Sequence, residues 1–405
     1  MKNKKIIYKN FIQKNHLNSN LYNNLKKKFN KNFLSISQNQ YIEKDVFHSL
    51  SKKFKFSFNV KDLKKFKKYK TVVLIGMGGS ILGTEAIYDF LKQKIKKDFH
   101  FFDNIDDDRI NIFKRNYKFS RTLFIIISKS GETLETLSNL LALKILKNNS
   151  KNLIVVSEKN NKSLHLLSKK MKFYFVEHKK YIGGRYSILS EVGMLPAYLM
   201  GLQINNFRKN ILIHLNKRKN KIFLKESSIK LANILLRKKI KSLVLFNYEP
   251  KLDKFLYWYQ QIIAESLGKK GKGFLPIISP APKDHHSLLQ LYLDGPKDKL
   301  FYILSCDQDL SNKLNTKKLD KSFKYFNNRS LDQIKHTQKN VFIKILKKKK
   351  IPFREFKIDS YNEQTIGELF SYFIIETVLI GKLINVNPFD QPAVEKVKKI
   401  TKKLI

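Results

Sequence analysis

TVVLIGMGGS, residues 71–80, is the stretch that decides the fold. It begins as an apolar run of the length of one strand and ends in glycines, which let the backbone turn tightly. A Gly-rich turn after such a strand commonly opens a helix, so we expect a helix to begin at Ser80. Further short apolar runs follow at 123–128, 153–157 and 173–176, with room for helices between them. The alternation predicts a parallel sheet covered by helices on both faces.

A second set of apolar runs, at 242–247, 300–306 and 352–358, predicts a second unit of the same α/β class. At 405 residues the chain also exceeds the size at which one hydrophobic core usually stops growing. We therefore expect an N-terminal helical segment, two α/β domains and a C-terminal helix, with the bounds 1–70, 71–225, 226–385 and 386–405.

The composition is strongly basic, with 81 Lys and Arg against 33 Asp and Glu and a formal net charge of +48. The lysines fall in nearly every segment and form no single tail or stripe, so the charge alone is weak support for a nucleic-acid partner. The same charge produces a field that concentrates phosphorylated ligands near the protein.

Compartment and membrane signals are weak. The lone Cys306 forbids an intramolecular disulfide, and its apolar surroundings indicate a small core residue. The N-terminus is positive but lacks the apolar stretch of a signal peptide. The most apolar segment, 366–384, is interrupted by Glu368, Glu376 and Lys382, which favours a buried amphipathic helix over a membrane span. Cytoplasm is the default expectation.

Two turns have the composition of a phosphate site. GMGGS, residues 76–80, follows a strand, but Ile81 stands where a dinucleotide fingerprint needs glycine. SKSGETLET, residues 128–136, offers hydroxyls and backbone donors to a dianion, and Ser130 or Thr133 could equally be a helix N-cap. At the carboxyl ends of parallel strands, both turns would border one crevice.

Three further residues bear chemistry. Arg185 follows two glycines in IGGRYS and can hold negative charge that develops on a substrate oxygen, although a solvated loop arginine is the plainer alternative. Gln261 and Glu265 lie four apart and share one helical face. Glu265 could act as a base if its neighbours exclude water, while most helical glutamates are solvated. The neighbours expected to desolvate it are Tyr257, Trp258, Tyr259, Ile262 and Ile263.

His285 and His286 can both give and take protons near neutral pH, and adjacent histidines point in different directions, so we expect one at most to face a site. No Cys/His cluster accompanies them, which makes a metal site a poor interpretation. In NPFDQPAVEKVKK, residues 387–399, Asp390 suits a cap and Pro392 the first turn of a final helix. Gln391 and Lys398 could point into a site or be surface groups.

Together these segments resemble the glucose-6-phosphate isomerase (phosphoglucose isomerase) family. The segments that carry the resemblance are GMGGS, SKSGETLET, GGRYS, QIIAESLGK, HHSLLQL and FDQPAVEKVK, which occur in the family's order from Gly76 to Lys398. The resemblance implies two sugar-isomerase (SIS) domains, a homodimer with a shared active site, and no metal or organic cofactor. The implied substrate is a phosphorylated hexose, with neither a specific nucleic acid nor a membrane as partner.

The resemblance also implies residue roles. Glu265 would shuttle a proton between C2 and C1 of the sugar, and Arg185 would stabilise the enediolate. His286, from the neighbouring subunit, and Lys398 would assist ring opening. The phosphate and the rest of the substrate would be bound by Gly79, Ser80, Ser128, Lys129, Ser130, Thr133, Gln261 and Gln391.

Three departures from the family pattern stand out. Glu132 replaces a threonine beside the phosphate loop, where a carboxylate is unfavourable unless it points away. His285 replaces a glutamine, and Pro392 with Ala393 replaces Trp-Gly or Pro-Gly. Two rival interpretations remain, a bifunctional phosphoglucose/phosphomannose isomerase and a SIS protein that binds sugar phosphates without catalysis.

Overall fold

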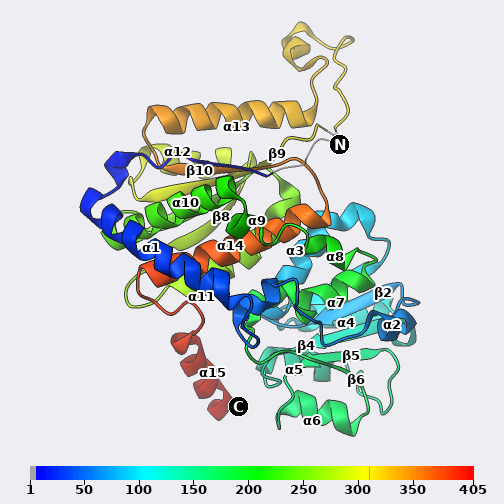
Figure 1. Cartoon of the computed structure of the whole chain (residues 1–405). Coiled ribbons are helices and arrows are strands. Elements are labelled where there is room, and N and C mark those ends of the chain that lie inside the picture. The colour runs from blue at the N-terminus through cyan, green and yellow to red at the C-terminus, as the bar shows by residue number, and fades with distance from the viewer. Residues whose placement is uncertain (1–5, 310) are drawn as a thin grey trace.

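The computed structural model describes residues 6–309 and 311–405, and it contains two five-stranded sheets (Figure 1). The first sheet is parallel throughout. Its strands, in spatial order, are β3 (Asp98–Phe102), β2 (Thr71–Ile75), β4 (Thr122–Ile127), β5 (Leu153–Ser157) and β6 (Tyr174–Glu177). The predicted parallel sheet is therefore confirmed, and β3 is a strand that the sequence reading missed.

The second sheet is parallel except for one edge. Its order is β1 (Ile7–Asn10), β10 (Phe353–Ile358), β9 (Lys299–Cys306), β7 (Ser242–Asn247) and β8 (Leu275–Pro280). The antiparallel edge strand β1 lies in the segment predicted to be helical. Its sequence, IYKN, is too short and polar to show as an apolar run, and β8 carries two prolines, which weaken a strand signal.

Helices separate and cover the two sheets. They are α1 (Ser19–Asn39), α2 (Val60–Leu63), α3 (Leu82–Leu91), α4 (Asp107–Asn116), α5 (Leu134–Ala142), α6 (Ser163–Lys170), α7 (Glu191–Leu199), α8 (Ile204–Phe207), α9 (Ile213–Asn216), α10 (Arg218–Arg237), α11 (Asp253–Leu267), α12 (Leu289–Asp294), α13 (Leu331–Lys348), α14 (Glu363–Leu383) and α15 (Pro392–Leu404). The fold class is confirmed, while the domain bounds stay a prediction; α10 crosses the predicted bound at 225/226.

The side chains of alternate residues in these strands pack in different hydrophobic cores. In β2, Val73 and Ile75 pack under α4, α5 and α6, whereas Val72 and Leu74 face a large central core. The second sheet does the same: Phe246 packs against α12 and α13, and Leu245 faces the central core. Because both sheets contribute one face to the same core, their relative position is held by buried apolar surface. Cys306 belongs to this core, as predicted.

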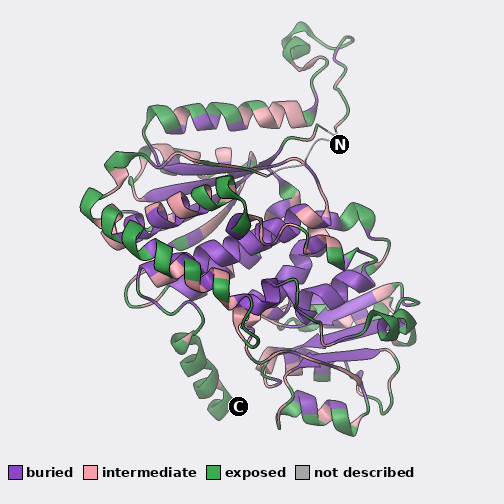
Figure 2. Ribbon diagram, viewed as in Figure 1, coloured by how far each residue is buried: buried purple, intermediate pink, exposed green. Residues whose placement is uncertain are grey.

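The helix α14 corrects one prediction. It was expected to be amphipathic, but it lies in the central core and is buried on nearly all sides (Figure 2). Its charges are accommodated by partners: Glu376 is paired with Arg354 at 2.8 Å, and Glu368 lies 3.3 Å from His214. Among the described residues, no helix has the length and apolarity needed to cross a bilayer.

A buried acid lies where α3 of the first sheet meets α11 of the second. Burial raises the pKa of Glu85 to about 7, Lys254 at 3.6 Å opposes this shift, and Asp103 and Arg109 act in smaller and opposite senses. Since the folded-state pKa exceeds the ordinary value of 4.5, ionisation of Glu85 costs folded-state stability as the pH rises from about 4.5 through 7.

We therefore expect Glu85→Gln to gain stability relative to the wild type across this pH window, by an amount on the order of 1–3 kcal/mol. Urea unfolding of both proteins at pH 4.5 and pH 8 measures the gain. A difference in unfolding free energy that does not change with pH would contradict the assignment.

Candidate active site

The GMGGS turn brings two loops into backbone contact. Residues Gly78–Ser80 form one 3-10 turn, and α3 begins at Leu82, two residues later than predicted. Gly78 has a φ of +52°, which favours glycine. A Cβ added to Gly79 would lie 2.3 Å from the carbonyl carbon of Gly184 and 2.4 Å from the amide nitrogen of Arg185. The absence of a side chain at Gly79 therefore lets the turn touch the loop that carries Arg185.

We expect Gly79→Ala to destabilise the fold by roughly 1–3 kcal/mol, because backbone atoms must move to admit the methyl group. Gly184→Ala is the matched control, since nothing lies within 4 Å of its added Cβ. Thermal or urea unfolding of both variants measures the difference. Equal effects of the two substitutions would show that the contact at Gly79 does not constrain the turn.

The segment SKSGETLET, residues 128–136, is called the hydroxyl loop below, and it follows β4, the neighbour of β2. Ser128 Oγ lies 2.9 Å from Thr133 Oγ1 and accepts a hydrogen bond from the Gly131 amide at 3.2 Å, while Ser130 Oγ accepts one from the Glu132 amide. Thr133 occupies the N-cap position of α5, but its side chain makes no capping hydrogen bond. The expected capping alternative is thus wrong for Thr133, whose hydroxyl instead joins the cluster.

The two turns are adjacent, because they follow the paired strands β2 and β4. A Cβ on Gly76 would lie 3.1 Å from the carbonyl oxygen of Ile127, the last residue of β4, and 3.2 Å from the buried Ser80. Both turns therefore lie at the carboxyl edge of the first sheet, the usual ligand-binding edge of a parallel sheet.

In the described part of the chain, three lysines and two glutamates form ion pairs at the hydroxyl loop. Burial lowers the pKa of Lys129, and Glu158 at 3.6 Å opposes that shift. Glu132 stands where the family pattern has a threonine. It pairs with Lys402 and with Lys162, each at 3.1 Å, and these partners lower its pKa. The Glu132 carboxylate is consequently balanced by two ammonium groups.

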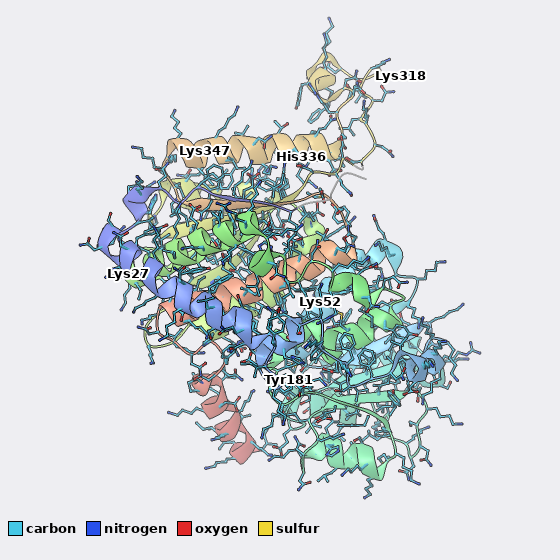
Figure 3. The ribbon with its side chains drawn as sticks, in the orientation of Figure 1. Lys27, Lys52, Tyr181, Lys318, His336 and Lys347 are labelled. Atoms are coloured by element: carbon cyan, nitrogen blue, oxygen red, sulfur yellow. The ribbon has the colours of Figure 1, made fainter. Side chains whose placement is uncertain are left out.

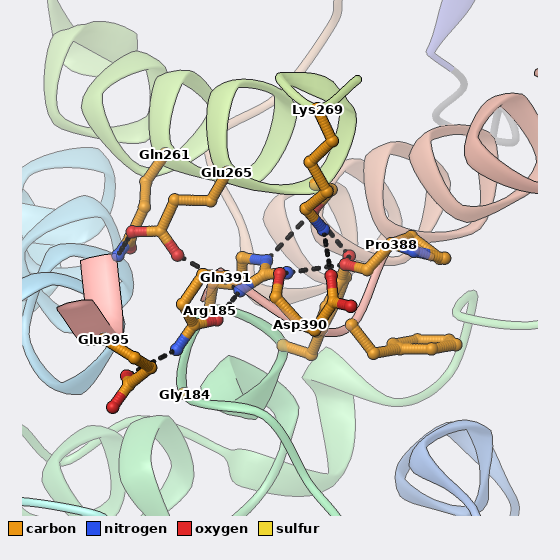
Figure 4. A network of polar contacts seen from close by, with 12 residues as sticks. Gly184, Arg185, Gln261, Glu265, Lys269, Pro388, Asp390, Gln391 and Glu395 are labelled. Atoms are coloured by element: carbon orange, nitrogen blue, oxygen red, sulfur yellow. Dashed lines mark hydrogen bonds and ion pairs between the residues drawn. The ribbon is translucent and has the colours of Figure 1, made fainter. Parts of the chain in front are cut away.

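Arg185 is the centre of the polar network in Figure 4. Its side chain is buried and donates to Glu265 Oε2 at 3.1 Å and to Gln391 Oε1 at 2.5 Å. It also donates to Ser266 Oγ and to the backbone carbonyls of Pro388 and Asp390. The guanidinium thereby connects the GGRYS loop, the end of α11 and the segment between α14 and α15, which excludes the solvated-loop alternative.

Glu265 has polar partners in place of the apolar surroundings that we expected. Its Oε1 accepts a hydrogen bond from Gln261 Nε2 at 2.9 Å, as the four-residue spacing predicted, and its side chain is 26% exposed. Trp258 is buried in the central core and Tyr257 is 47% exposed, so neither ring desolvates the carboxylate as expected. Its electrostatic environment is set by Arg185.

The two histidines point in different directions. His285 hydrogen-bonds with the Tyr248 hydroxyl at 2.7 Å and stacks on Phe246, and burial lowers its pKa. His286 is exposed. It follows the carboxyl end of β8, whereas α11 runs back along the sheet so that Glu265 lies near the amino end of β8; Gln260 already contacts Pro276. His286 and Glu265 of one chain therefore lie toward opposite ends of this six-residue strand, which is roughly 20 Å long.

The C-terminal segment enters the network through Gln391. Asp390 was expected to cap the last helix, but it is paired with Lys269 at 2.7 Å, and Gln391 takes the N-cap position ahead of Pro392. The Lys398 ammonium lies 3.3 Å from Glu395, which is in turn 3.5 Å from Gln391 Nε2. Lys398 is thus linked to Arg185 through two intermediate side chains.

Sequence reasoning missed four side chains of this network: Tyr186, Ser266, Lys269 and Glu395. The Tyr186 hydroxyl bonds to Ser266 Oγ at 2.6 Å and donates to the Pro388 carbonyl at 2.8 Å, and burial raises its pKa. Lys269 holds Asp390. Each lies within four positions of a predicted site residue in the sequence. This closeness in sequence is the signal that could have identified them.

Comparison with known proteins decides the family. The family model of phosphoglucose isomerase matches residues 19–273. The chain belongs to the phosphoglucose isomerase family. Within it, the chain is 33% identical over 363 residues to the glucose-6-phosphate isomerase of Methanocaldococcus jannaschii, covering 86% of this chain and 87% of that protein. It is also 33% identical over 357 residues to the enzyme of Mycoplasmopsis pulmonis, covering 82% of each.

Solved structures share the fold. A glucose-6-phosphate isomerase from Chlamydia trachomatis superposes with a TM-score of 0.79 at 17% identity, over 98% of this chain and 88% of that one. A Thermus thermophilus protein described as hypothetical superposes with a TM-score of 0.83 at 22% identity, over 98% of this chain and 99% of that one. The phosphoglucose isomerase architecture thus extends over almost the whole chain.

Proposed function

We propose that the chain interconverts glucose 6-phosphate and fructose 6-phosphate, as the names of its relatives describe for them. The observation that carries the proposal is the 3.1 Å contact of the Arg185 guanidinium with Glu265, in a residue whose backbone amide packs against Gly79 of the GMGGS turn. A base beside a fixed positive charge, close to an anion-binding edge, is what isomerisation of a phosphorylated sugar requires.

In this proposal the phosphate is bound at the carboxyl edge of the first sheet. Ser128, Ser130 and Thr133 supply hydroxyls, Gly79 and Ser80 supply the turn, and the Lys129 side chain, which also lies 3.6 Å from Glu158, supplies a further donor. Gln261 and Gln391 border the remaining part of the site. Holding the substrate by this distant group leaves its C1 and C2 free to lie against Glu265.

Glu265 then moves the proton. From the open-chain aldose its carboxylate removes the proton on C2, the electrons form the C1–C2 double bond, and the carbonyl oxygen at C1 gains negative charge. Arg185 stabilises this enediolate. The hydroxyl on C2 gives up its proton as the negative oxygen on C1 takes one, so that C1 carries a hydroxyl and C2 the carbonyl. Glu265 returns the proton it holds to C1, which completes the ketose.

Ring opening requires a second set of groups, and we assign it to His286 and Lys398. In a single chain His286 lies on the far end of β8 from Glu265 and is exposed. This separation supports a homodimer in which His286 of the partner subunit completes the site. Lys398 is in α15, whose residues are exposed in one chain and whose first turn is held at Arg185 by Gln391.

A coupled assay with purified protein tests the proposal. NADPH formation from fructose 6-phosphate through glucose-6-phosphate dehydrogenase should be rapid without added metal. Mannose 6-phosphate as a second substrate separates a single from a bifunctional isomerase. Absence of turnover with every sugar, together with tight binding of fructose 6-phosphate, would favour a binding protein without catalysis.

A further inference from the structure

A second concave site lies at the opposite edge of the first sheet. It is a pocket of about 480 Å³ in front of the amino ends of β5 and β6, in the size range of small-molecule sites. Three short segments line it: Lys65, Phe66 and Lys68; Asn149, Ser150 and Lys151; and Lys172, Phe173 and Tyr174.

The pocket is lined by four lysines and by no acid. Lys65, Lys68, Lys151 and Lys172 are exposed and can turn toward a bound group. Among the ion pairs of residues 6–309 and 311–405, none involves these four ammonium groups. Burial is the main cause of the raised pKa of the Tyr174 phenol, and the charge of Asp62 adds to it. Asp62 forms an ion pair with none of the four lysines. The positive charge of the pocket is therefore not balanced by the chain itself.

The floor of the pocket is rigid. Phe66 and Phe173 are buried in the first sheet's two cores, and the rings of Phe66 and Tyr174 meet edge to face with centroids 5.2 Å apart. The Lys65 ammonium lies 4.7 Å from the Tyr174 ring centre, a cation–π contact that holds this charge over the pocket. The lysines at the rim of the pocket thus lie next to aromatic side chains that are packed in place.

We propose that this pocket binds a small polyanion that carries two or more phosphate groups. Four ammonium groups around one cavity supply more positive charge than a single phosphate dianion neutralises. Each of the four ammonium groups adds its own attraction to the charge of the ligand. Ser150 and Asn149 offer neutral hydrogen-bonding groups beside the cations.

The pocket is distinct from the candidate active site. The hydroxyl loop follows the carboxyl end of β4, whereas the pocket precedes β5 and β6, so the two sites are separated by roughly 15 Å, the length of the five-residue strand β5. The proposal therefore does not depend on the isomerase activity.

Isothermal titration with sodium tripolyphosphate at physiological salt tests the proposal. The wild type should bind tripolyphosphate saturably at the pocket, independently of any binding at the hydroxyl loop, and Lys65→Ala/Lys151→Ala should weaken binding at the pocket roughly tenfold. The matched control is Lys26→Ala/Lys27→Ala on α1, which removes the same charge from exposed positions outside the pocket and should change affinity less than twofold. Ser128→Ala should leave the affinity unchanged, because it alters only the candidate active site.

Lysine acetylation read by mass spectrometry gives a residue-level measurement on the wild type. Tripolyphosphate should protect Lys65, Lys68, Lys151 and Lys172 and leave Lys26 and Lys27 reactive. Equal loss of affinity in both double variants, or protection spread evenly over the surface lysines, would overturn the proposal in favour of general charge attraction. Loss of binding in Ser128→Ala would overturn it in favour of the active-site phosphate loop.

Discussion

Glu265→Gln is expected to lower the turnover number by roughly 10³-fold, within the range by which positioned general bases accelerate reactions. The amide keeps the size of the side chain and can still accept from Gln261, but it cannot take the proton from carbon. The KM for fructose 6-phosphate should change little, because in the proposed site the phosphate is bound by the hydroxyl loop and not by Glu265. Steady-state kinetics in the coupled assay measure both constants.

Glu395→Gln is the matched control for this change. Glu395 is another carboxylate of the same network, but its described contacts are with Gln391 and Lys398, not with Arg185. Its replacement should cost no more than a few-fold in turnover, since it removes no proton-transfer group. If Glu265→Gln kept most of the activity, or if the two variants lost it equally, Glu265 would not be the base.

Arg185→Lys is expected to lower turnover by roughly 10²–10³-fold, the loss typical of removing one donor that stabilises a developing oxyanion. Arg185 makes five hydrogen bonds, to Glu265, Ser266, Gln391 and two backbone carbonyls. A lysine ammonium has three donors on one atom and cannot reproduce this fork. The change should therefore also loosen the segment that holds Gln391 and α15.

Arg208→Lys controls for the general effect of losing a partly buried guanidinium. Arg208 donates to the carbonyls of Leu189 and Ser51, outside the candidate site. Both variants should lose stability in a thermal melt, but only Arg185→Lys should lose turnover at a temperature where both are folded. A normal turnover number for folded Arg185→Lys would remove Arg185 from the mechanism.

Apolar runs at the centres of sheets were the most predictable part of the fold. β2, β4, β5, β7 and β9 were located from such runs, because strands buried on both faces are largely apolar. The edge strand β6 and the strand β10, whose sequence FREFKI contains three charged residues, were located as well. The strands that were missed are β1, β3 and β8, which all lie at sheet edges. One flank of an edge strand is not covered by a neighbour, so its sequence need not be uniformly apolar.

The candidate site was predictable where a local pattern dictates geometry. The four-residue spacing placed Gln261 on Glu265, and the Gly-rich turn placed Gly79 near a ligand edge. The pairing of Arg185 with Pro388, Asp390 and Gln391 was not predictable, because it joins positions about 200 residues apart through the central core. Nothing local to Glu265 revealed that a guanidinium, and not an aromatic ring, would adjoin its carboxylate.

The lysine-rich surface illustrates a different limit. Figure 3 shows side chains such as Lys27, Lys52, Lys318 and Lys347 projecting from many elements around the molecule. From the sequence, Lys65 and Lys151 are indistinguishable from these lysines. Only folding brings them to one concave surface without an acid, because their segments precede different strands of one sheet.

The central claim is that Glu265 carries a proton between C1 and C2, and isomerisation in D2O followed by NMR tests it most directly. A carboxyl-bound proton exchanges with solvent, so fructose 6-phosphate should yield glucose 6-phosphate that carries deuterium at C2. Glu265→Gln should incorporate deuterium at a rate reduced by the same roughly 10³-fold as turnover. Interconversion without any solvent deuterium in the product, or undiminished incorporation by Glu265→Gln, would contradict the mechanism.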